Sequence, residues 1–170
     1  MSNDEIFMTA ALNQAKLAYA LGEVPVGAVV IKNGEIVGTG YNRRESDKNA
    51  LAHAEILAID SACRHLGGWR LWECELYVTL EPCPMCTGAI INSRIKRVIY
   101  GACDPKAGSI ESVAELLKLP YNHTPPTLGG VLGEECSELL KSFFRELREK
   151  RAKQRRNLNA ESDGGRDDKY

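Results

Sequence analysis

Two strand-like segments separated by a helix-like segment constrain the fold of this chain most strongly. Residues 75–80 and 97–100 are rich in side chains that favour β-structure, and a helical pattern starts at Pro84 between them. Strands that are joined through a helix by a connection of this length lie parallel in one sheet. The sequence therefore predicts a βαβ unit.

The segments before this unit predict a helix and a hairpin. Residues 2–5 have the capping-box pattern, and apolar residues follow at helical spacing until Gly22. Residues 26–31 and 36–41 are rich in β-forming residues, and the Asn33-Gly34 pair between them favours a tight antiparallel turn. We expect these two strands to pair with each other.

The remaining segments predict a layered arrangement. A second helix is expected to end at Gly67, and beyond the βαβ unit we expect a helix near residues 111–118, a strand around 127–131 and a long amphipathic helix through 136–147. The predicted apolar face of the second helix consists of Ile56, Ile59, Cys63 and Leu66. The alternation of strands and helices predicts an α/β protein, a three-layer α/β/α sandwich with a five-stranded mixed sheet.

Size and composition fit one globular domain. The chain has 170 residues, 44% of them hydrophobic, and no apolar run approaches the ~20 residues of a membrane-spanning helix. We expect residues 1–156 to form a single domain and residues 157–170 to be a disordered tail, because the tail is almost without apolar side chains. The acidic start lacks the features of a secretory signal, so we expect a cytoplasmic protein whose six cysteines are thiols or metal ligands.

Positive charge is concentrated near the C-terminus. The whole chain has a net charge of −1, but residues 141–156, here called the basic arm, contain eight basic and two acidic residues, a local charge of +6. Two interpretations remain open. The arm attracts phosphate groups, or its basic residues complement the dipole at a solvated helix end.

Two cysteines and a histidine have the chemistry of a metal site. Cys83 and Cys86 lie at a predicted helix start, where Pro84 suits the first helical position, and their spacing allows both sulfurs to reach one ion. With His53 they provide the three protein ligands that a catalytic zinc ion takes while water occupies its fourth position. A closed structural site needs one more ligand. We therefore expect one catalytic Zn²⁺ per subunit.

Glu55 is the candidate proton carrier beside this ion. On a regular helix Glu55 would point away from His53, because successive side chains are about 100° apart. If the metal lies off the front end of the helix, however, His53 can bind it while Glu55 reaches the bound water. Zinc lowers the pKa of such a water to about 7, and a carboxylate that is not a ligand can then move its proton.

The two clusters together form a known signature. His53-Ala54-Glu55 and Pro82-Cys83-Pro84-Met85-Cys86 match the pattern H-x-E…P-C-x-x-C of the zinc-dependent nucleobase deaminases. With GEVPVGAVVI, GYN, SRIKRVIYGACDPKAG and FF, the chain resembles the bacterial tRNA-specific adenosine deaminases up to about Lys150. The resemblance implies a cytidine-deaminase-like fold, a homodimer, and conversion of adenosine to inosine at the wobble position of a tRNA anticodon, in an arginine tRNA.

The resemblance also implies roles for individual residues. His53, Cys83 and Cys86 would hold zinc. Glu55 would take a proton from the bound water, deliver it to N1 of adenine as hydroxide attacks C6, and help to protonate the departing ammonia. Asn42 would hydrogen-bond the extruded base, in a pocket that Val26 and Ala54 line. The residues expected to contact the tRNA anticodon loop are Asp104, Lys106, Arg148 and Arg151.

Three alternatives remain. A deaminase of free purines such as guanine would share the signature and would not need the basic arm. A zinc module without enzymatic activity would close its metal site with Cys63, Cys74 or Cys103. A redox pair at Cys83 and Cys86 would leave His53 and Glu55 without a role. Under the leading hypothesis the four other cysteines are expected to be buried thiols: Cys63, Cys74, Cys103 and Cys136.

Overall fold

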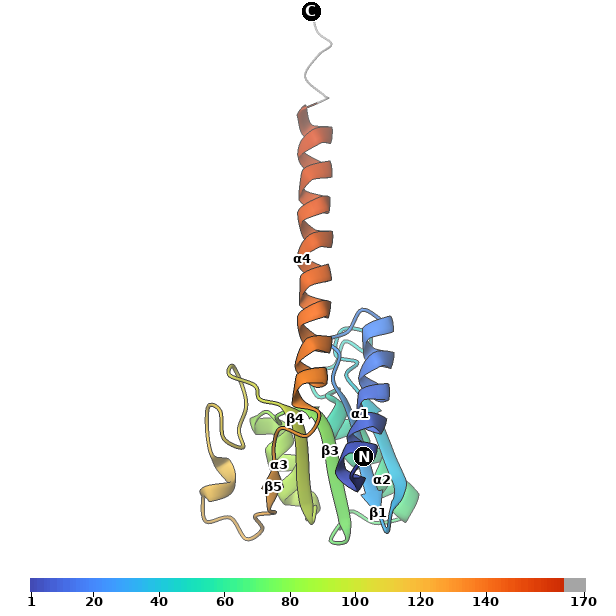
Figure 1. Ribbon diagram of the computed structural model, residues 1–170, viewed down its shortest axis with the longest axis vertical. Helices are drawn as coiled ribbons and strands as arrows, with labels where there is room; N and C mark the ends of the chain where they lie inside the picture. The colour runs from blue at the N-terminus through green and yellow to red at the C-terminus, as the bar shows by residue number, and fades with distance from the viewer. Residues whose placement is uncertain (164–170) are drawn as a thin grey trace, which may run out of the picture.

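The computed structural model describes the backbone of residues 1–163 and the side chains of residues 1–159, and it has one five-stranded mixed sheet of order β2-β1-β3-β4-β5 (Figure 1). β1 (Gly27–Lys32) pairs antiparallel with β2 (Glu35–Tyr41) and with β3 (Cys74–Leu80). β4 (Arg97–Ala102) lies parallel between β3 and the short β5 (Thr127–Leu128). The predicted hairpin and βαβ unit are both confirmed.

Two helices cover each face of this sheet. α1 (Asn3–Ala20) and α4 (Gly133–Asp163) pack on one face, and α2 (Ala54–Leu66) and α3 (Pro84–Ser93) pack on the other (Figure 1). α1 begins with the predicted capping box, in which the Ser2 hydroxyl accepts from the backbone amide of Glu5 and the Glu5 carboxylate accepts from the backbone amide of Ser2. The three-layer α/β/α sandwich is therefore confirmed.

The central strands are buried on both faces, because alternate side chains enter two different cores. Side chains facing α2 and α3 include Ala28, Val30, Leu76, Val78 and Val98. Those facing α1 and α4 include Val29, Ile31, Tyr77 and Ile99. This two-sided burial fixes the start of β1 and the ends of β3 and β4 beside the starts of α2 and α3.

The buried side of α2 differs from the predicted one. Of the predicted face only Ile59 is fully buried, whereas Ile56 and Cys63 are half-buried and Leu66 is 37% exposed. The helix lies so close to β2 that a Cβ on Gly38 or Gly40 would come within 2.4 Å of a backbone oxygen of α2. Such an approach requires small side chains on the facing side of the helix. The residues that α2 buries are Ala54, Glu55, Ala58, Ile59 and Ala62.

The helix predicted near residues 111–118 is mostly absent. Only the 3₁₀ turn η1 (Leu116–Lys118) forms there, and the segment before it consists of turns. The amides of Ile110, Glu111 and Ser112 donate to the buried carboxylate of Glu81 instead of forming helical hydrogen bonds. The long-range partner therefore overrides the local helical preference.

The C-terminal helix is longer than predicted. α4 extends well beyond the body of the protein (Figure 1), and residues 157–163, predicted as part of a disordered tail, continue it. Adding a residue to an existing helix needs no new nucleus, so a polar segment can extend a helix without burying apolar surface. The rest of the predicted tail, residues 164–170, lies outside the described residues. None of the described helices is long and apolar enough to cross a membrane.

Candidate active site

Three side chains from two helix starts converge on one point. His53 and Cys83 are the N-cap residues of α2 and α3, and Cys86 lies in the first turn of α3. His53 Nδ1 lies 3.7 Å from the sulfur of Cys83 and 3.6 Å from the sulfur of Cys86. Tetrahedral zinc with ordinary bond lengths places a nitrogen and a sulfur ligand about 3.6 Å apart. The donor set and its spacing therefore fit a zinc ion.

The other cysteines do not complete a closed zinc site. Among residues 1–159, whose side chains the structure describes, the possible metal-ligand group around His53 contains only Cys83 and Cys86 besides the histidine. Cys74 and Cys136 are buried, as predicted. The prediction was wrong for the other two, since Cys63 is half-buried and Cys103 is exposed. Cys103 follows the last residue of β4 and lines a pocket, which explains its exposure. The described residues thus give no support to the closed zinc module.

One of the three ligands, Cys83, is prepared to bind a cation, whereas the hydrogen bond with Cys83 and burial raise the pKa of the Cys86 thiol. Hydrogen bonds from Cys86 and then from His53 lower the pKa of the Cys83 thiol to about 4, against the opposing effect of burial. The hydrogen bond with Cys83 also raises the pKa of His53. At neutral pH the site therefore holds a thiolate, which is the form of cysteine that binds zinc.

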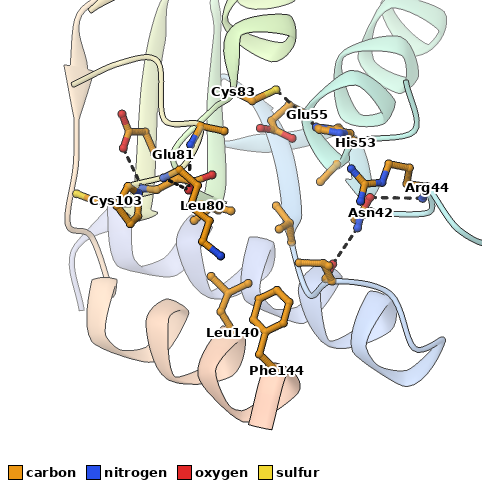
Figure 2. Close-up of a pocket in the computed structure, with 17 residues that line it drawn as sticks. Asn42, Arg44, His53, Glu55, Leu80, Glu81, Cys83, Cys103, Leu140 and Phe144 are labelled. Atoms are coloured by element: carbon orange, nitrogen blue, oxygen red, sulfur yellow. Dashed lines mark hydrogen bonds between the residues drawn. The ribbon is translucent and has the colours of Figure 1, made fainter. Parts of the chain in front are cut away.

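Glu55 lies buried beside these ligands. It is 4% exposed, and removal from water raises the pKa of its carboxyl group to about 7. Because His53 precedes the first helical residue of α2, the helical angle between the two residues does not apply, and both side chains reach the same place (Figure 2). A carboxyl group with this pKa can take up and release a proton near neutral pH.

A pocket of about 380 Å³ opens next to this group (Figure 2). Asn42, Val26 and Ala54, the residues predicted to hold a base, all line it, and so do Asp104 and Lys106. The Asn42 amide is held in place, since its nitrogen donates to the carbonyl oxygen of Val24 at 3.2 Å and its oxygen accepts from the backbone of Arg44 at 3.4 Å. Arg148 and Arg151 are exposed on α4 and do not line the pocket.

Sequence reasoning missed several residues of the pocket wall. Leu140 and Phe144 reach the pocket from α4, and Phe144 belongs to the FF pair that contributed to the family resemblance (Figure 2). The sequence analysis assigned no place in the pocket to seven further lining residues, four of which (Val24, Cys103, Pro105 and Ala107) lie in segments that carry the family resemblance: Val24, Arg44, Leu80, Glu81, Cys103, Pro105 and Ala107. They come from separate loops and strand ends, and only the folded chain brings them together.

Comparisons with known proteins agree with this geometry. Residues 1–102 match the family model of the cytidine and deoxycytidylate deaminase zinc-binding region. The chain is 50% identical over 159 residues to the tRNA-specific adenosine deaminase of Bacillus subtilis (strain 168), covering 93% of this chain and 99% of the relative.

Two solved structures share the fold. One, from biochemical and structural studies of A-to-I editing by tRNA:A34 deaminases at the wobble position of transfer RNA, has a TM-score of 0.76 and 42% identity, and the match covers 78% of this chain and 97% of that one. The other, a guanine deaminase from Nitrosomonas europaea, has a TM-score of 0.69 and 25% identity, with 82% and 83% of the two chains covered.

Proposed function

The chain belongs to the zinc-binding cytidine and deoxycytidylate deaminase family, and we propose that it converts adenosine to inosine at the wobble position of a tRNA anticodon. The observation that carries this proposal is a three-ligand zinc site with a buried carboxyl group beside it, at the side of a pocket of about 380 Å³. The reaction consumes one water and releases one ammonia at C6 of the purine.

The residues of the site divide the chemistry between them. His53, Cys83 and Cys86 would hold zinc, and the bound ion would supply a Lewis acid that makes water a nucleophile at neutral pH. Glu55 accepts one proton of the attacking water and passes it to N1 of adenine. It then takes the second proton from the oxygen added at C6 and passes it to the departing amino group, which leaves as ammonia. Asn42 hydrogen-bonds the base, and Val26 and Ala54 pack against its faces.

An RNA substrate is favoured over a free purine. Identity to the Bacillus subtilis tRNA-specific enzyme is 50%, whereas identity to the Nitrosomonas europaea guanine deaminase is 25%. Phe144 and Lys106 line the same pocket, and the basic arm continues α4 beyond Phe144. An aromatic ring and cations around a pocket suit an unstacked base and its phosphates in an anticodon loop.

An assay of three substrates tests this proposal. Ammonia release is measured with guanine, free adenosine and an unmodified arginine tRNA transcript, and the nucleoside at the wobble position is identified by mass spectrometry. We expect ammonia from the tRNA alone, with inosine at the wobble position. Turnover of guanine without turnover of the tRNA would instead identify a free-purine deaminase.

Several further features belong to the same proposal. We place the protein in the cytoplasm as a homodimer with one zinc ion per subunit, and we treat residues 1–156 as a single zinc deaminase domain. Besides Asp104 and Lys106, Arg148 and Arg151 contact the tRNA. Sedimentation velocity of the zinc-loaded protein checks the dimer, because a species of monomer mass at micromolar concentration would contradict it.

A further inference from the structure

Two polar walls of the pocket are each tied to a buried glutamate from another part of the chain. Glu23 is 1% exposed and Glu81 is 2% exposed, although neither belongs to the proposed chemistry. In the described part of the chain neither carboxylate forms an ion pair. A buried carboxylate without a cation is costly unless several donors surround it, so its donors show what it holds.

Glu81 holds the loop that begins with Asp104. Its Oε2 accepts from the amide of Asp104 at 3.0 Å and from the Ser112 hydroxyl. Its Oε1 accepts from the amides of Ile110, Glu111 and Ser112 at 3.1, 2.8 and 3.0 Å. One carboxylate therefore binds both ends of residues 104–112, the segment that presents Asp104 and Lys106 to the pocket.

Glu23 holds the opposite wall. Its carboxylate accepts from the amides of Glu45 and Ser46 at 3.3 and 2.5 Å. The next residue, Val24, accepts the hydrogen bond from the side chain of Asn42. The segment that carries Asn42 and Arg44 is thereby fastened at two points, and Figure 2 shows these two residues across the pocket from Glu81.

We propose that Glu23 and Glu81 are positioning residues that hold these two walls at the separation that admits the target adenosine and its flanking backbone. The inference rests on the proposed function, because it assigns both carboxylates to substrate fit. Arg44 and Lys106 stand on the two anchored walls, so releasing either anchor moves a cation and a hydrogen-bonding residue away from the RNA. Glu55 and Cys86 lie in the first turns of α2 and α3, and His53 and Cys83 cap these helices, so we expect the metal ligands and Glu55 to keep their places.

Glu81→Gln and Glu23→Gln test the proposal with little change in volume. In Glu81→Gln the amide nitrogen must face at least one backbone N–H, so at least one anchoring hydrogen bond is lost. With a tRNA anticodon stem-loop as substrate, we expect KM to rise about tenfold and kcat to change by less than about threefold in each variant. Zinc content should stay at the wild-type level.

The matched control is Glu75→Gln. Glu75 is on the same strand that precedes Glu81 but at its opposite end, where it accepts hydrogen bonds from Tyr77 and Arg97 and does not line the pocket. This variant also loses a partly buried carboxylate. We expect it to keep the wild-type kcat and KM.

Gly108→Ala provides an independent test that leaves the carboxylate intact. A Cβ on Gly108 would lie 2.3 Å from Glu81 Oε2 and 2.6 Å from the carbonyl oxygen of Asp104, so the loop must shift. It should reproduce the rise in KM. Ser112→Ala, which removes one hydroxyl donor, should give a smaller rise and keeps the test available if Gly108→Ala does not fold.

Amide hydrogen exchange measures the anchor without a substrate. In Glu81→Gln the amides of Asp104 and of residues 110–112 should exchange faster than in wild type, and in Glu75→Gln they should not. An active wild-type enzyme together with unchanged KM in the Glu23 and Glu81 variants would overturn the inference, as would a fall in kcat alone. A wild-type enzyme inactive on RNA would overturn the proposed function instead, while the exchange rates would still report on the anchor.

Discussion

His53 and Glu55 are two residues apart yet serve one point of the pocket, because the chain enters α2 between them. His53 has extended backbone angles as the N-cap residue, and Glu55 has a helical backbone within the first turn. Cys83 and Cys86 repeat the arrangement at the start of α3. A cap residue and a first-turn residue can point in the same direction even when they are two positions apart, as His53 and Glu55 are. Two residues at that separation inside a helix cannot do so.

Replacing Glu55 tests its role as proton carrier. We expect Glu55→Ala and Glu55→Gln to bind zinc at the wild-type stoichiometry but to lose at least ~100-fold in kcat, since general acid-base catalysis contributes this much. Metal content by atomic absorption and single-turnover rates on tRNA check this. Asp60→Ala removes an exposed carboxylate of the same helix and should leave the rate unchanged. Near-normal turnover of both Glu55 variants would refute the assignment.

At the scale of elements, the position of the site depends on how closely α2 approaches β2. Gly38 and Gly40 face the backbone of α2, and the small residues Ala54, Ala58 and Ala62 face them. Ala54 lies between His53 and Glu55, the proposed metal ligand and the proposed proton carrier. The distance between the sheet and the start of α2 therefore sets where His53 and Glu55 lie.

Gly40→Ala should disturb the metal site through this contact. Its Cβ would lie 2.2 Å from the carbonyl oxygen of Ala54, so the first turn of α2 must move. We expect weaker zinc binding and a loss of about 1–3 kcal/mol in stability from overpacking. Gly68→Ala is the control, because a Cβ there meets nothing within 4 Å. Zinc affinity by competition with a chelator should separate the two variants.

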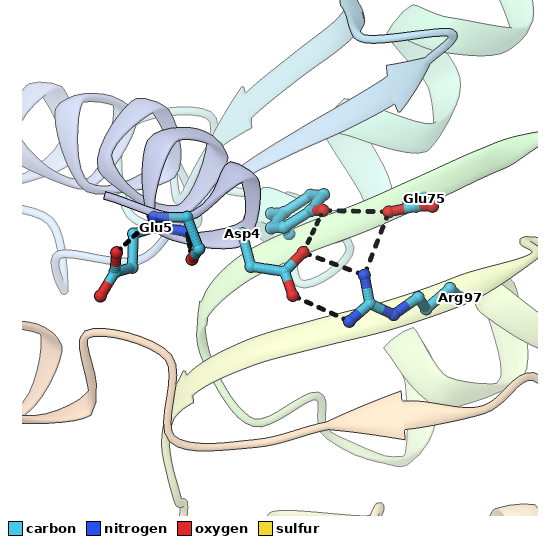
Figure 3. Close-up of polar contacts among 6 residues, drawn as sticks. Asp4, Glu5, Glu75 and Arg97 are labelled. Atoms are coloured by element: carbon cyan, nitrogen blue, oxygen red, sulfur yellow. Dashed lines mark hydrogen bonds and ion pairs between the residues drawn. The ribbon is translucent and has the colours of Figure 1, made fainter.

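The start of α1 is tied to the sheet by a polar network (Figure 3). Arg97 of β4 donates to both oxygens of Asp4 at 2.9 and 2.8 Å, and the Tyr77 hydroxyl of β3 donates to Asp4 at 2.7 Å. Glu75 accepts from the same arginine and the same tyrosine. None of these four residues lines the pocket, so we expect the network to stabilise the fold and to take no part in the reaction.

Asp4→Asn should lower the free energy of unfolding by about 1–3 kcal/mol at neutral pH, since the hydrogen bonds to a charged group are weakened. The hydrogen bond with Arg97 lowers the pKa of Asp4 below its ordinary value of 3.8. Ionised Asp4 therefore stabilises the fold at pH values above its ordinary pKa, and this stabilisation is lost as the pH falls through its pKa in the folded state. Urea denaturation of wild type and Asp4→Asn at several pH values should therefore show that the difference between their free energies of unfolding becomes smaller in acid. A difference that does not depend on pH would contradict this expectation.

At the scale of the whole molecule, the basic arm stands out from the globular body. Its basic residues end at Arg156, whereas α4 continues to Asp163 and has no basic residue in its last turn. The interpretation that these residues complement the dipole at the helix end is therefore wrong. From residue 148 to residue 156 every side chain is exposed, so this part of the arm is accessible to a large polyanion such as tRNA.

Removal of residues 148–170 tests the arm. We expect weaker tRNA binding and a shallower dependence of log K on log salt, by about 0.7–0.9 for each phosphate that the shortened protein no longer neutralises. Fluorescence anisotropy with labelled tRNA at several salt concentrations measures both. Replacing the basic residues after Leu147 by glutamine should have the same effect while keeping the helix. An unchanged salt slope in both variants would contradict a role of this segment in RNA binding.

Local patterns in the sequence were sufficient for most of the elements and for naming the candidate zinc ligands. The capping box, the Asn-Gly turn and the P-C-x-x-C segment act through neighbouring residues, so their consequences can be read within a few positions of the chain. The prediction of a helix near residues 111–118 was wrong because Glu81, far away in the sequence, takes the amides of that segment.

The sequence by itself determined which residues can bind zinc and which carboxylate can move a proton, because ligand chemistry belongs to residue type and short spacing. Only the tertiary structure decided how far apart His53, Cys83 and Cys86 lie, that Leu140 and Phe144 line the pocket from α4, and that α2 buries three of its alanines rather than Ile56 and Leu66. The physical reason is that these distances are set by strand order and by backbone packing across the sheet, which no local pattern specifies.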